Sequence, residues 1–251
     1  MIDLHSHILP GLDDGAKSLE EALRMCEMGY RDGIRTIVAT PHTLNGVYQN
    51  NRSTILGKVR EFRAALEESS FFSDKRQEEW ALVILPGADV HLSQETLPQL
   101  DEGKVTTLGD GGKSLLIEFP NQSIPHGAEQ ILLQLIGRGI IPVITHPERN
   151  LDLLQRPQRY QEMILMGCVG QVTAISLTGG FGPEVKRFSE DLLKRSLIHV
   201  IASDAHSADG RAPILMSGVE AAAKIVGKQE AWKMVTDYPQ AILNGERPGA
   251  L

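Results

Sequence analysis

Short apolar runs alternate with helical segments along the whole chain. The runs are rich in β-branched residues, and they lie at 2–4, 34–39, 81–85, 114–119, 140–145, 169–173 and 198–202. Between most of them, apolar residues recur with the 3.6-residue period of an amphipathic helix. The pattern predicts helices at about 18–31, 54–68, 128–138, 184–194 and 212–226. Strands that alternate with helices predict a parallel sheet with helical crossovers.

Local signals support these elements. Ser18 is followed three residues later by Glu21, the spacing of a capping box at a helix start. Gly33 and Gly139 fall between a predicted helix and the next strand, where a left-handed cap is common. The unbroken apolar run 34–39 is typical of a strand buried on both faces. We therefore expect an α/β fold, a closed barrel of about seven strands, with a doubly wound open sheet as the alternative.

Length and composition agree with one globular domain. The chain has 251 residues, 41% hydrophobic and 23% charged, which are ordinary globular values and exclude a disordered or fibrous protein. We found no repeat and no long linker, so we expect residues 1–251 to form a single domain. The formal net charge of −7 argues against nucleic acid or an anionic membrane surface as the main partner.

The sequence also predicts a compartment. Cys26 and Cys168 are too few for a disulfide framework. The N-terminus has neither the basic region nor the apolar stretch of a signal peptide, and no apolar run approaches the length of a membrane span. We expect a cytoplasmic protein without membrane insertion.

The histidines are not scattered. The chain has eight of them, and five follow or end predicted strands. In barrels, functional groups gather at the carboxyl ends of the strands and on the loops that follow. The residues of ligand type at or just after these ends are His5, His7, Asp14, His42, Asp89, Glu118, His146, Asp204 and His206.

The spacing of these residues points to metal binding. Residues i and i+2 of a strand share a face, so His5 and His7 can reach one point, as can Asp204 and His206. Imidazole and carboxylate ligands suit Zn²⁺, Mn²⁺ or Fe²⁺. Nine such residues are enough for two or three ions.

Structural interpretations exist for single residues. A lone His-x-His pair is a weak signal, His146 before a proline can form a turn, and Asp204 can cap a helix. Glu118 is harder to explain in this way, because an unpaired carboxylate in a buried strand is costly. His91, His126 and His199 are interpreted as surface or structural histidines.

Together, these segments resemble the PHP (polymerase and histidinol phosphatase) superfamily of metal-dependent phosphoesterases. Within it, the chain resembles the bacterial protein-tyrosine phosphatases of capsule and exopolysaccharide loci. The resemblance covers residues 1 to about 245 and rests on Asp3-Leu4-His5-Ser6-His7, Gly11-Leu12-Asp13-Asp14-Gly15, Ala39-Thr40-Pro41-His42, Ile144-Thr145-His146-Pro147-Glu148-Arg149, Ser203-Asp204-Ala205-His206 with Arg211, and Tyr238-Pro239-Gln240-Ala241-Ile242-Leu243-Asn244.

The resemblance implies a distorted (β/α)₇ TIM-like barrel with up to three divalent ions, Mn²⁺ being favoured. By position, one ion would be held by His5, His7, Asp89 and Asp204, a second by Asp89, Glu118 and His146, and a third by Asp14, His42 and His206. Arg149 and Arg211 match the arginines that receive the phosphate. The family usually has Glu at the position of Asp89, so the carboxylate expected to bridge two ions is one methylene shorter here.

The activity implied is hydrolysis of phosphotyrosine in a protein by metal-activated hydroxide, with a tyrosine kinase of capsule or exopolysaccharide synthesis as the substrate. Arg149 and Arg211 would stabilise the transition state, and His206 is a weaker candidate for a proton donor. A salt bridge from Arg149 to Glu148 or Asp152 is the structural alternative for that arginine, and a surface position near a helix start is the alternative for Arg211.

A cysteine-based phosphatase is excluded by the sequence. That chemistry needs an arginine six residues after the cysteine, where this chain has Asp32 and Ala174. Three other hypotheses stay open: a PHP phosphoesterase acting on histidinol phosphate, a sugar phosphate or a nucleotide; an amidohydrolase-like enzyme that cleaves C–N bonds; and a non-catalytic metal-binding regulatory module.

Overall fold

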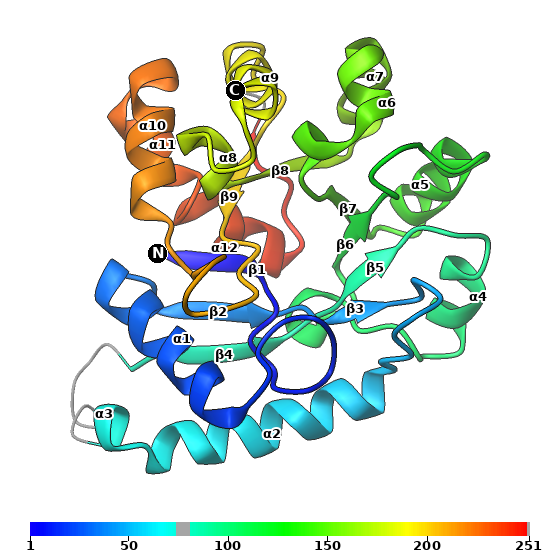
Figure 1. Cartoon of the computed structure of the whole chain (residues 1–251). Coiled ribbons are helices and arrows are strands. Elements are labelled where there is room, and N and C mark those ends of the chain that lie inside the picture. Colours follow the sequence, from blue (N-terminus) through cyan, green and yellow to red (C-terminus); the bar gives the residue numbers. More distant parts are fainter. Residues whose placement is uncertain (74–80, 250–251) are drawn as a thin grey trace.

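Parallel strands and surrounding helices make up the structure, a computed structural model that describes residues 1–73 and 81–249 (Figure 1). The strands are β1 (Ile2–Ser6), β2 (Thr36–Ala39), β3 (His42–Thr43), β4 (Val83–Pro86), β5 (Asp89–His91), β6 (Ser114–Glu118), β7 (Ile141–Ile144), β8 (Val169–Thr173) and β9 (Val200–Ala202). The α-helices are α1 (Leu19–Asp32), α2 (Arg52–Glu68), α3 (Ser70–Ser73), α4 (Thr96–Asp101), α5 (Ala128–Gly137), α6 (Leu151–Gln155), α7 (Pro157–Met166), α8 (Ala174–Thr178), α9 (Pro183–Lys194), α10 (Met216–Val226), α11 (Lys228–Lys233) and α12 (Asp237–Asn244). Two 3₁₀ helices, η1 (Leu108–Asp110) and η2 (Pro147–Arg149), complete the described elements.

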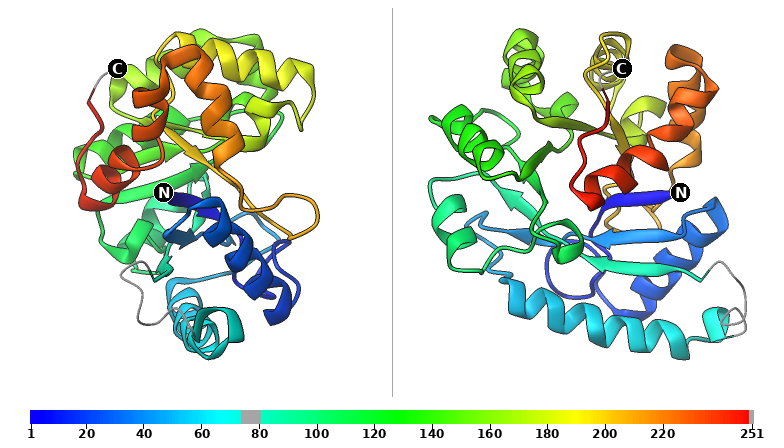
Figure 2. Two further views of the ribbon diagram at one scale, coloured as in Figure 1. Left: turned by 90° about the vertical axis from the view of Figure 1, so that its left-hand side faces the viewer. Right: turned by 180° about the vertical axis from the view of Figure 1, so that it is seen from behind.

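The sheet is parallel and curled. Hydrogen bonds join the strands in the orders β1-β2-β4 and β3-β5-β6-β7-β8-β9. Most of the helices lie outside the curve, whereas α12 lies inside it beside β1, as the view from behind shows (Figure 2). The α/β fold is thus a curled half-barrel and not the doubly wound open sheet considered as the alternative, because that fold covers both faces of its sheet with helices.

The hydrophobic pattern placed the main elements correctly. Each of the seven predicted runs coincides with or overlaps a strand, whereas β3 and β5 were not predicted. The Ser18 hydroxyl accepts a hydrogen bond from the amide of Glu21 at 3.2 Å and caps α1, which ends at Gly33 with φ of 99°. The helix expected from residue 212 begins later, at Met216.

Two layers of apolar side chains stabilise this arrangement. The larger cluster lies between the helices and the sheet and includes Met25, Phe62 and Leu192. A smaller cluster unites β1, β2, β6, β7, β8 and β9 with η1 and α12, and it consists of Leu4, Val38, Leu108, Leu116, Val143, Val169, Val200 and Ile242. Close packing of these small branched residues holds the strand ends in fixed relative positions.

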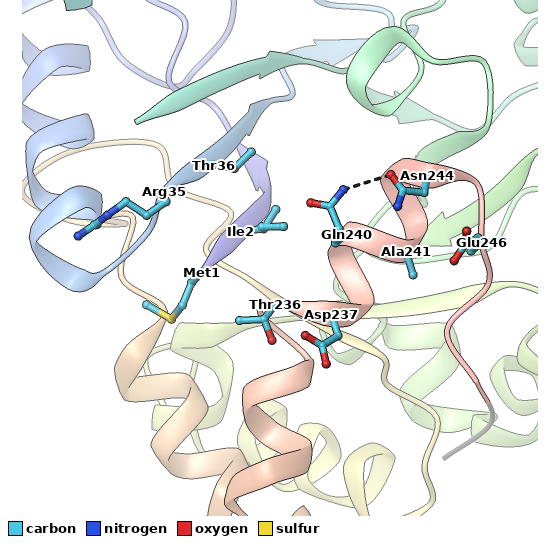
Figure 3. A pocket seen from close by; sticks show the side chains of 10 residues that line it. All are labelled: Met1, Ile2, Arg35, Thr36, Thr236, Asp237, Gln240, Ala241, Asn244 and Glu246. Atoms are coloured by element: carbon cyan, nitrogen blue, oxygen red, sulfur yellow. Dashed lines mark hydrogen bonds between the residues drawn. The ribbon is translucent and has the colours of Figure 1, made fainter. Parts of the chain in front are cut away.

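The amino ends of the strands open on a pocket of about 540 Å³ (Figure 3). Its lining includes Met1 and Thr36 at the starts of the first strands and Gln240 on α12, whose side-chain amide donates to Asn244 Oδ1 at 3.1 Å. It thus lies at the end of the sheet opposite His5 and His7.

None of the described helices combines the length and the apolar character needed to cross a bilayer.

Candidate metal centre

The predicted ligands meet at the carboxyl ends of the strands. His5 lies in β1, and the loop that follows carries His7 and Asp14. This loop and the segment after β9 are joined by the His7 amide, which donates to the Ala205 carbonyl at 2.8 Å. The remaining ligands come from or follow β3, β5, β6, β7 and β9: His42, Asp89, Glu118, His146, Asp204 and His206.

Irregular backbone conformations occur at several of these residues and influence where their side chains point. Pairing of β1 with β2 is irregular between Asp3 and Ser6, and such irregularities redirect side chains near active sites. Two of the predicted ligand residues have positive φ, 29° at His146 and 51° at Asp204, a conformation that costs energy outside glycine. Gly15 is required beside Asp14, because a Cβ there would stand 2.1 Å from the His7 carbonyl oxygen.

Potential ligand atoms converge in three overlapping groups, each with its atoms within 4.8 Å of one another. The groups are His7, Asp14, His42 and His206; His5, His7 and Asp89; and His42, Asp89 and Glu118. Asp204 Oδ1 lies 3.3 Å from His5 Nε2 and 3.5 Å from His7 Nε2, which places it beside the second group. His146 Nε2 lies 3.5 Å from Glu118 Oε1, beside the third.

Asp89 and His42 connect these groups. Asp89 Oδ2 lies 3.5 Å from His5 Nε2 and 3.2 Å from His42 Nδ1, so the short carboxylate reaches both neighbours. His42 turns its other nitrogen, Nε2, toward Asp14 Oδ1 at 3.5 Å. The His42 ring thus belongs to the first and the third of these groups, whereas the resemblance implied that it holds only the third ion, together with Asp14 and His206.

The donor set fits divalent cations. Both carboxylate oxygens of Asp89 and Nδ1 of His42 are buried without a hydrogen-bond partner among the described residues. The Nε2 atoms of His5 and His7 point at each other across 3.1 Å. Unpartnered buried carboxylates and converging imidazole nitrogens are costly in a bare protein and are the arrangement that Mn²⁺, Fe²⁺ or Zn²⁺ satisfies.

Two residues that the sequence analysis missed orient the histidines. Nδ1 of His7 donates to Asp13 Oδ2 at 2.7 Å, and Nδ1 of His5 donates to Gln171 Oε1 at 3.0 Å. Each bond fixes the tautomer that leaves Nε2 facing the centre. Gln171 could have been found as a polar residue inside an apolar strand, and Asp13 as the neighbour of a predicted ligand.

His91 was interpreted as an ordinary histidine but lies at the rim of this cluster. Its Nδ1 is 3.6 Å from Glu118 Oε2. It stands two residues after Asp89 on β5, so the spacing rule used for His5 and His7 could have identified it. His199 is structural, as expected, because its Nδ1 accepts from the Gly170 amide at 3.2 Å.

The charges around the centre shift several pKa values. Burial alone would raise the pKa of the Asp89 and Asp204 carboxyls, but nearby histidines outweigh it and hold both pKa values well below the usual range. Burial and the charge of His7 lower the pKa of His206 to about 2. That value favours the neutral imidazole, the form that binds metals, over the protonated form that a proton donor requires.

Both predicted arginines border the centre. Arg149 Nη1 donates to Asp204 Oδ2 at 2.6 Å, and Arg211 Nη2 donates to the same oxygen. Arg149 does not take the predicted structural partners. Glu148 accepts from the amide of Thr173 and the hydroxyl of Ser176, and Asp152 pairs with Arg156 and Arg159.

The structure defines an α/β protein whose curled parallel sheet gathers histidines, carboxylates and two arginines at one edge, and the comparisons with known proteins specify its family. Residues 1–244 match the model of the capsular polysaccharide synthesis family CpsB/CapC. The chain belongs to this family.

Its relatives are named as tyrosine phosphatases. The chain is 40% identical over 213 residues to tyrosine-protein phosphatase YwqE of Bacillus subtilis, covering 84% of this chain and 79% of the relative. It is 33% identical to tyrosine-protein phosphatase CpsB of Streptococcus pneumoniae, covering 97% and 98% of the two chains. It is 30% identical to the Staphylococcus aureus CapC protein, covering 98% and 92%.

One solved structure agrees with this family assignment, and a second shares only the fold. A crystal structure from work on YwqE and CpsB, described there as metal-dependent tyrosine phosphatases, superposes with a TM-score of 0.89 at 34% identity over 100% of this chain and 97% of the other. A β-aspartyl dipeptidase of Fervidobacterium islandicum superposes with a TM-score of 0.50 at 16% identity over 100% of this chain and 75% of that one, a likeness of fold alone.

Proposed function

We propose that this protein is a metal-dependent protein-tyrosine phosphatase that acts on a tyrosine kinase of capsule or exopolysaccharide synthesis. The observation that carries the proposal is the group of converging histidines and carboxylates. Asp89, whose buried oxygens have no hydrogen-bond partner among the described residues, lies at its middle, and two arginines lie at its edge. The named activities of the YwqE and CpsB relatives support it.

The metal assignment is part of the proposal. Two or three ions, with Mn²⁺ favoured, would be held by the nine side chains His5, His7, Asp14, His42, Asp89, Glu118, His146, Asp204 and His206. When bound, such ions lower the pKa of water and polarise phosphoryl oxygens. Asp89 would bridge two of them, which its contacts with His5 and His42 support.

We propose a distorted seven-stranded barrel as the architecture, with residues 1–251 forming a single phosphatase domain. β3 follows β2 after two residues and β5 follows β4 in the same way, so each pair can count as one interrupted strand. An isolated parallel bridge between Ser6 and Ala205 brings the first strand to the last. We keep the cytoplasm as the proposed compartment, since Cys26 and Cys168 are buried free thiols.

The chain's own side chains perform the remaining steps. Arg149 and Arg211 would donate N–H groups to the phosphate oxygens, because the planar guanidinium matches that geometry and stabilises charge in the transition state. The Tyr48 ring stacks on His42, with centroids 6.1 Å apart and planes at 11°. Tyr48 would therefore line the entrance and contact the phenyl ring of phosphotyrosine.

A cysteine nucleophile is not part of this proposal. Cys26 is fully buried, and burial raises the pKa of its thiol. Burial likewise raises the pKa of Cys168 to about 12. A thiol held protonated is a poor nucleophile.

Substrate preference and metal removal together test the proposal. We expect the manganese-loaded protein to hydrolyse a phosphotyrosine peptide in preference to histidinol phosphate. EDTA should abolish turnover, added Mn²⁺ should restore it, and vanadate should inhibit only weakly. Activity that survives exhaustive chelation would overturn the metal assignment. A strong preference for histidinol phosphate would instead establish a small phosphate ester as the substrate, and no turnover of either would favour a regulatory module.

A further inference from the structure

One aromatic ring contacts both arginines of the anion-binding edge. The ring of Phe181 lies with its centroid 5.0 Å from Arg149 Cζ and 5.7 Å from Arg211 Cζ. Phe181 comes from the link between α8 and α9, whereas Arg149 ends η2 and Arg211 follows β9. Three separate parts of the chain thus meet at this ring, which is half-buried.

The link that carries Phe181 has a backbone conformation that requires glycine at several positions. Gly179 and Gly182 have φ of 93° and 95°, values that residues with a side chain rarely adopt. A Cβ at Gly180 would stand 2.3 Å from Ile175 Cγ1, and the Gly180 amide donates to the Ile175 carbonyl at 2.9 Å. The glycines on both sides of Phe181 therefore permit the tight backbone path that places the ring beside the arginines.

The guanidinium groups of Arg149 and Arg211 carry like charges and share one hydrogen-bond acceptor. Both donate to the same oxygen of Asp204, so two positive charges lie close together and repel each other. Any phosphate that they bind competes with Asp204 for the same N–H donors. A cation–π contact uses the attraction between the cation and the face of the ring and leaves the N–H edge of the guanidinium free.

We propose that Phe181 is a positioning residue that holds Arg149 and Arg211 side by side as a clamp for the phosphate group. The inference rests on the proposed function, since it assumes that the arginines receive phosphate. Phe181 itself donates no hydrogen bond and acts through the two arginines.

The test compares Phe181→Leu with Phe181→Tyr in the full-length, manganese-loaded protein. Leucine keeps an apolar side chain but has no aromatic face, so the inhibition constant of inorganic phosphate and the KM for p-nitrophenyl phosphate should both rise about tenfold. Manganese content should stay unchanged. Tyrosine retains the ring, so Phe181→Tyr should remain close to the wild type.

A matched control separates positioning from stability. Phe188 lies on α9 in the hydrophobic core. Phe188→Leu should lower the melting temperature while leaving the phosphate inhibition constant unchanged. The reverse pattern is expected for Phe181→Leu.

A double-mutant cycle then shows whether Phe181 acts through the arginines. In an Arg149→Ala, Arg211→Ala background, Phe181→Leu should have no further effect on phosphate binding measured by calorimetry. An equal effect in both backgrounds would contradict the inference, as would an unchanged inhibition constant in an active protein. A wild-type protein that neither hydrolyses the ester nor binds phosphate would overturn the proposed function as well, so the two failures are distinguishable.

Discussion

Among single residues, His7 shows how protonation and metal binding compete in this centre. Burial alone would lower the pKa of His7, but the carboxylates of Asp13 and Asp204 outweigh it and raise the pKa to about 10. In the metal-free protein, a pKa of about 10 favours the cationic imidazolium form of His7 at neutral pH, with a proton on both ring nitrogens. A metal ion can bind His7 only when one of these protons leaves, because ligating imidazole is neutral.

We predict that Mn²⁺ binding at pH 7.5 releases protons, including the second ring proton of His7, and that apparent affinity falls as the pH is lowered. Titration calorimetry in two buffers of different ionisation enthalpy measures the proton count. Asp13→Asn is the matched control. It keeps an acceptor for His7 but removes the charge that raises the pKa, so it should release fewer protons. A binding heat independent of the buffer would contradict the prediction.

Among the elements, η2 is anchored to its neighbours by one buried carboxylate. Glu148 Oε1 accepts from the Thr173 amide at 3.0 Å and from the Ser176 hydroxyl at 2.7 Å. These bonds join η2 to the end of β8 and to α8. Because Arg149 is the next residue, the same bonds determine where its side chain begins.

Glu148→Ala should therefore affect both stability and substrate binding. Two buried donors lose their acceptor, and we expect a loss of about 2–3 kcal/mol in the free energy of unfolding. Urea unfolding of the metal-free protein measures this loss, and KM should rise because Arg149 is no longer held in place. Glu148→Gln keeps an acceptor oxygen and should lose less. Equal stability of the alanine variant and the wild type would exclude this anchoring role.

The elements that the sequence predicted are those with a sufficient local signal. Helices such as α2 span several turns, so their apolar period is evident. β3 has two residues and β5 has three, so neither is long enough to show an alternation. α8 has five residues, and α12, with eight, barely completes two turns. These short elements depend on tertiary packing, which no local pattern encodes.

The residues of the candidate site also fall into those that the sequence predicts and those that depend on tertiary contacts. That the nine predicted ligand residues lie close together was predictable, because strand ends of a parallel sheet meet at one edge. Asp13, Gln171 and Phe181 were not predicted, because their roles depend on partners that are distant in the sequence or on a loop turn. Positive φ at His146 and Asp204 also depends on tertiary contacts that hold the backbone there.

In the whole molecule, the candidate metal centre takes residues from both the first strand and the segment after the last. His5 and His7 belong to the amino-terminal end of the chain, whereas Asp204 and His206 follow β9. A ligand that binds only the folded state stabilises it by mass action. Metal binding at this position would therefore stabilise the contact between the two ends of the sheet as well as the site.

We predict that saturating Mn²⁺ raises the melting temperature by about 5–10 °C over the protein in EDTA. Asp204→Ala removes a carboxylate that faces both His5 and His7, so this variant should show little metal-dependent shift and no turnover. Gln240→Ala, at the opposite end of the sheet (Figure 3), is the control and should show the full shift. A full shift in Asp204→Ala would place the ions elsewhere.

The separation of the ligands along the chain also has a consequence for biosynthesis. The first ligand is residue 5 and the last is residue 206, so some four-fifths of the polypeptide must be made before all nine side chains exist. A ribosome adds about 5–20 residues each second, so this takes roughly 10–40 seconds. During that time, the emerging histidines and aspartates can offer only an incomplete site. On the proposed assignment, the complete set of ligands is thus available only late in synthesis, when residues near the carboxyl end of the chain have been added.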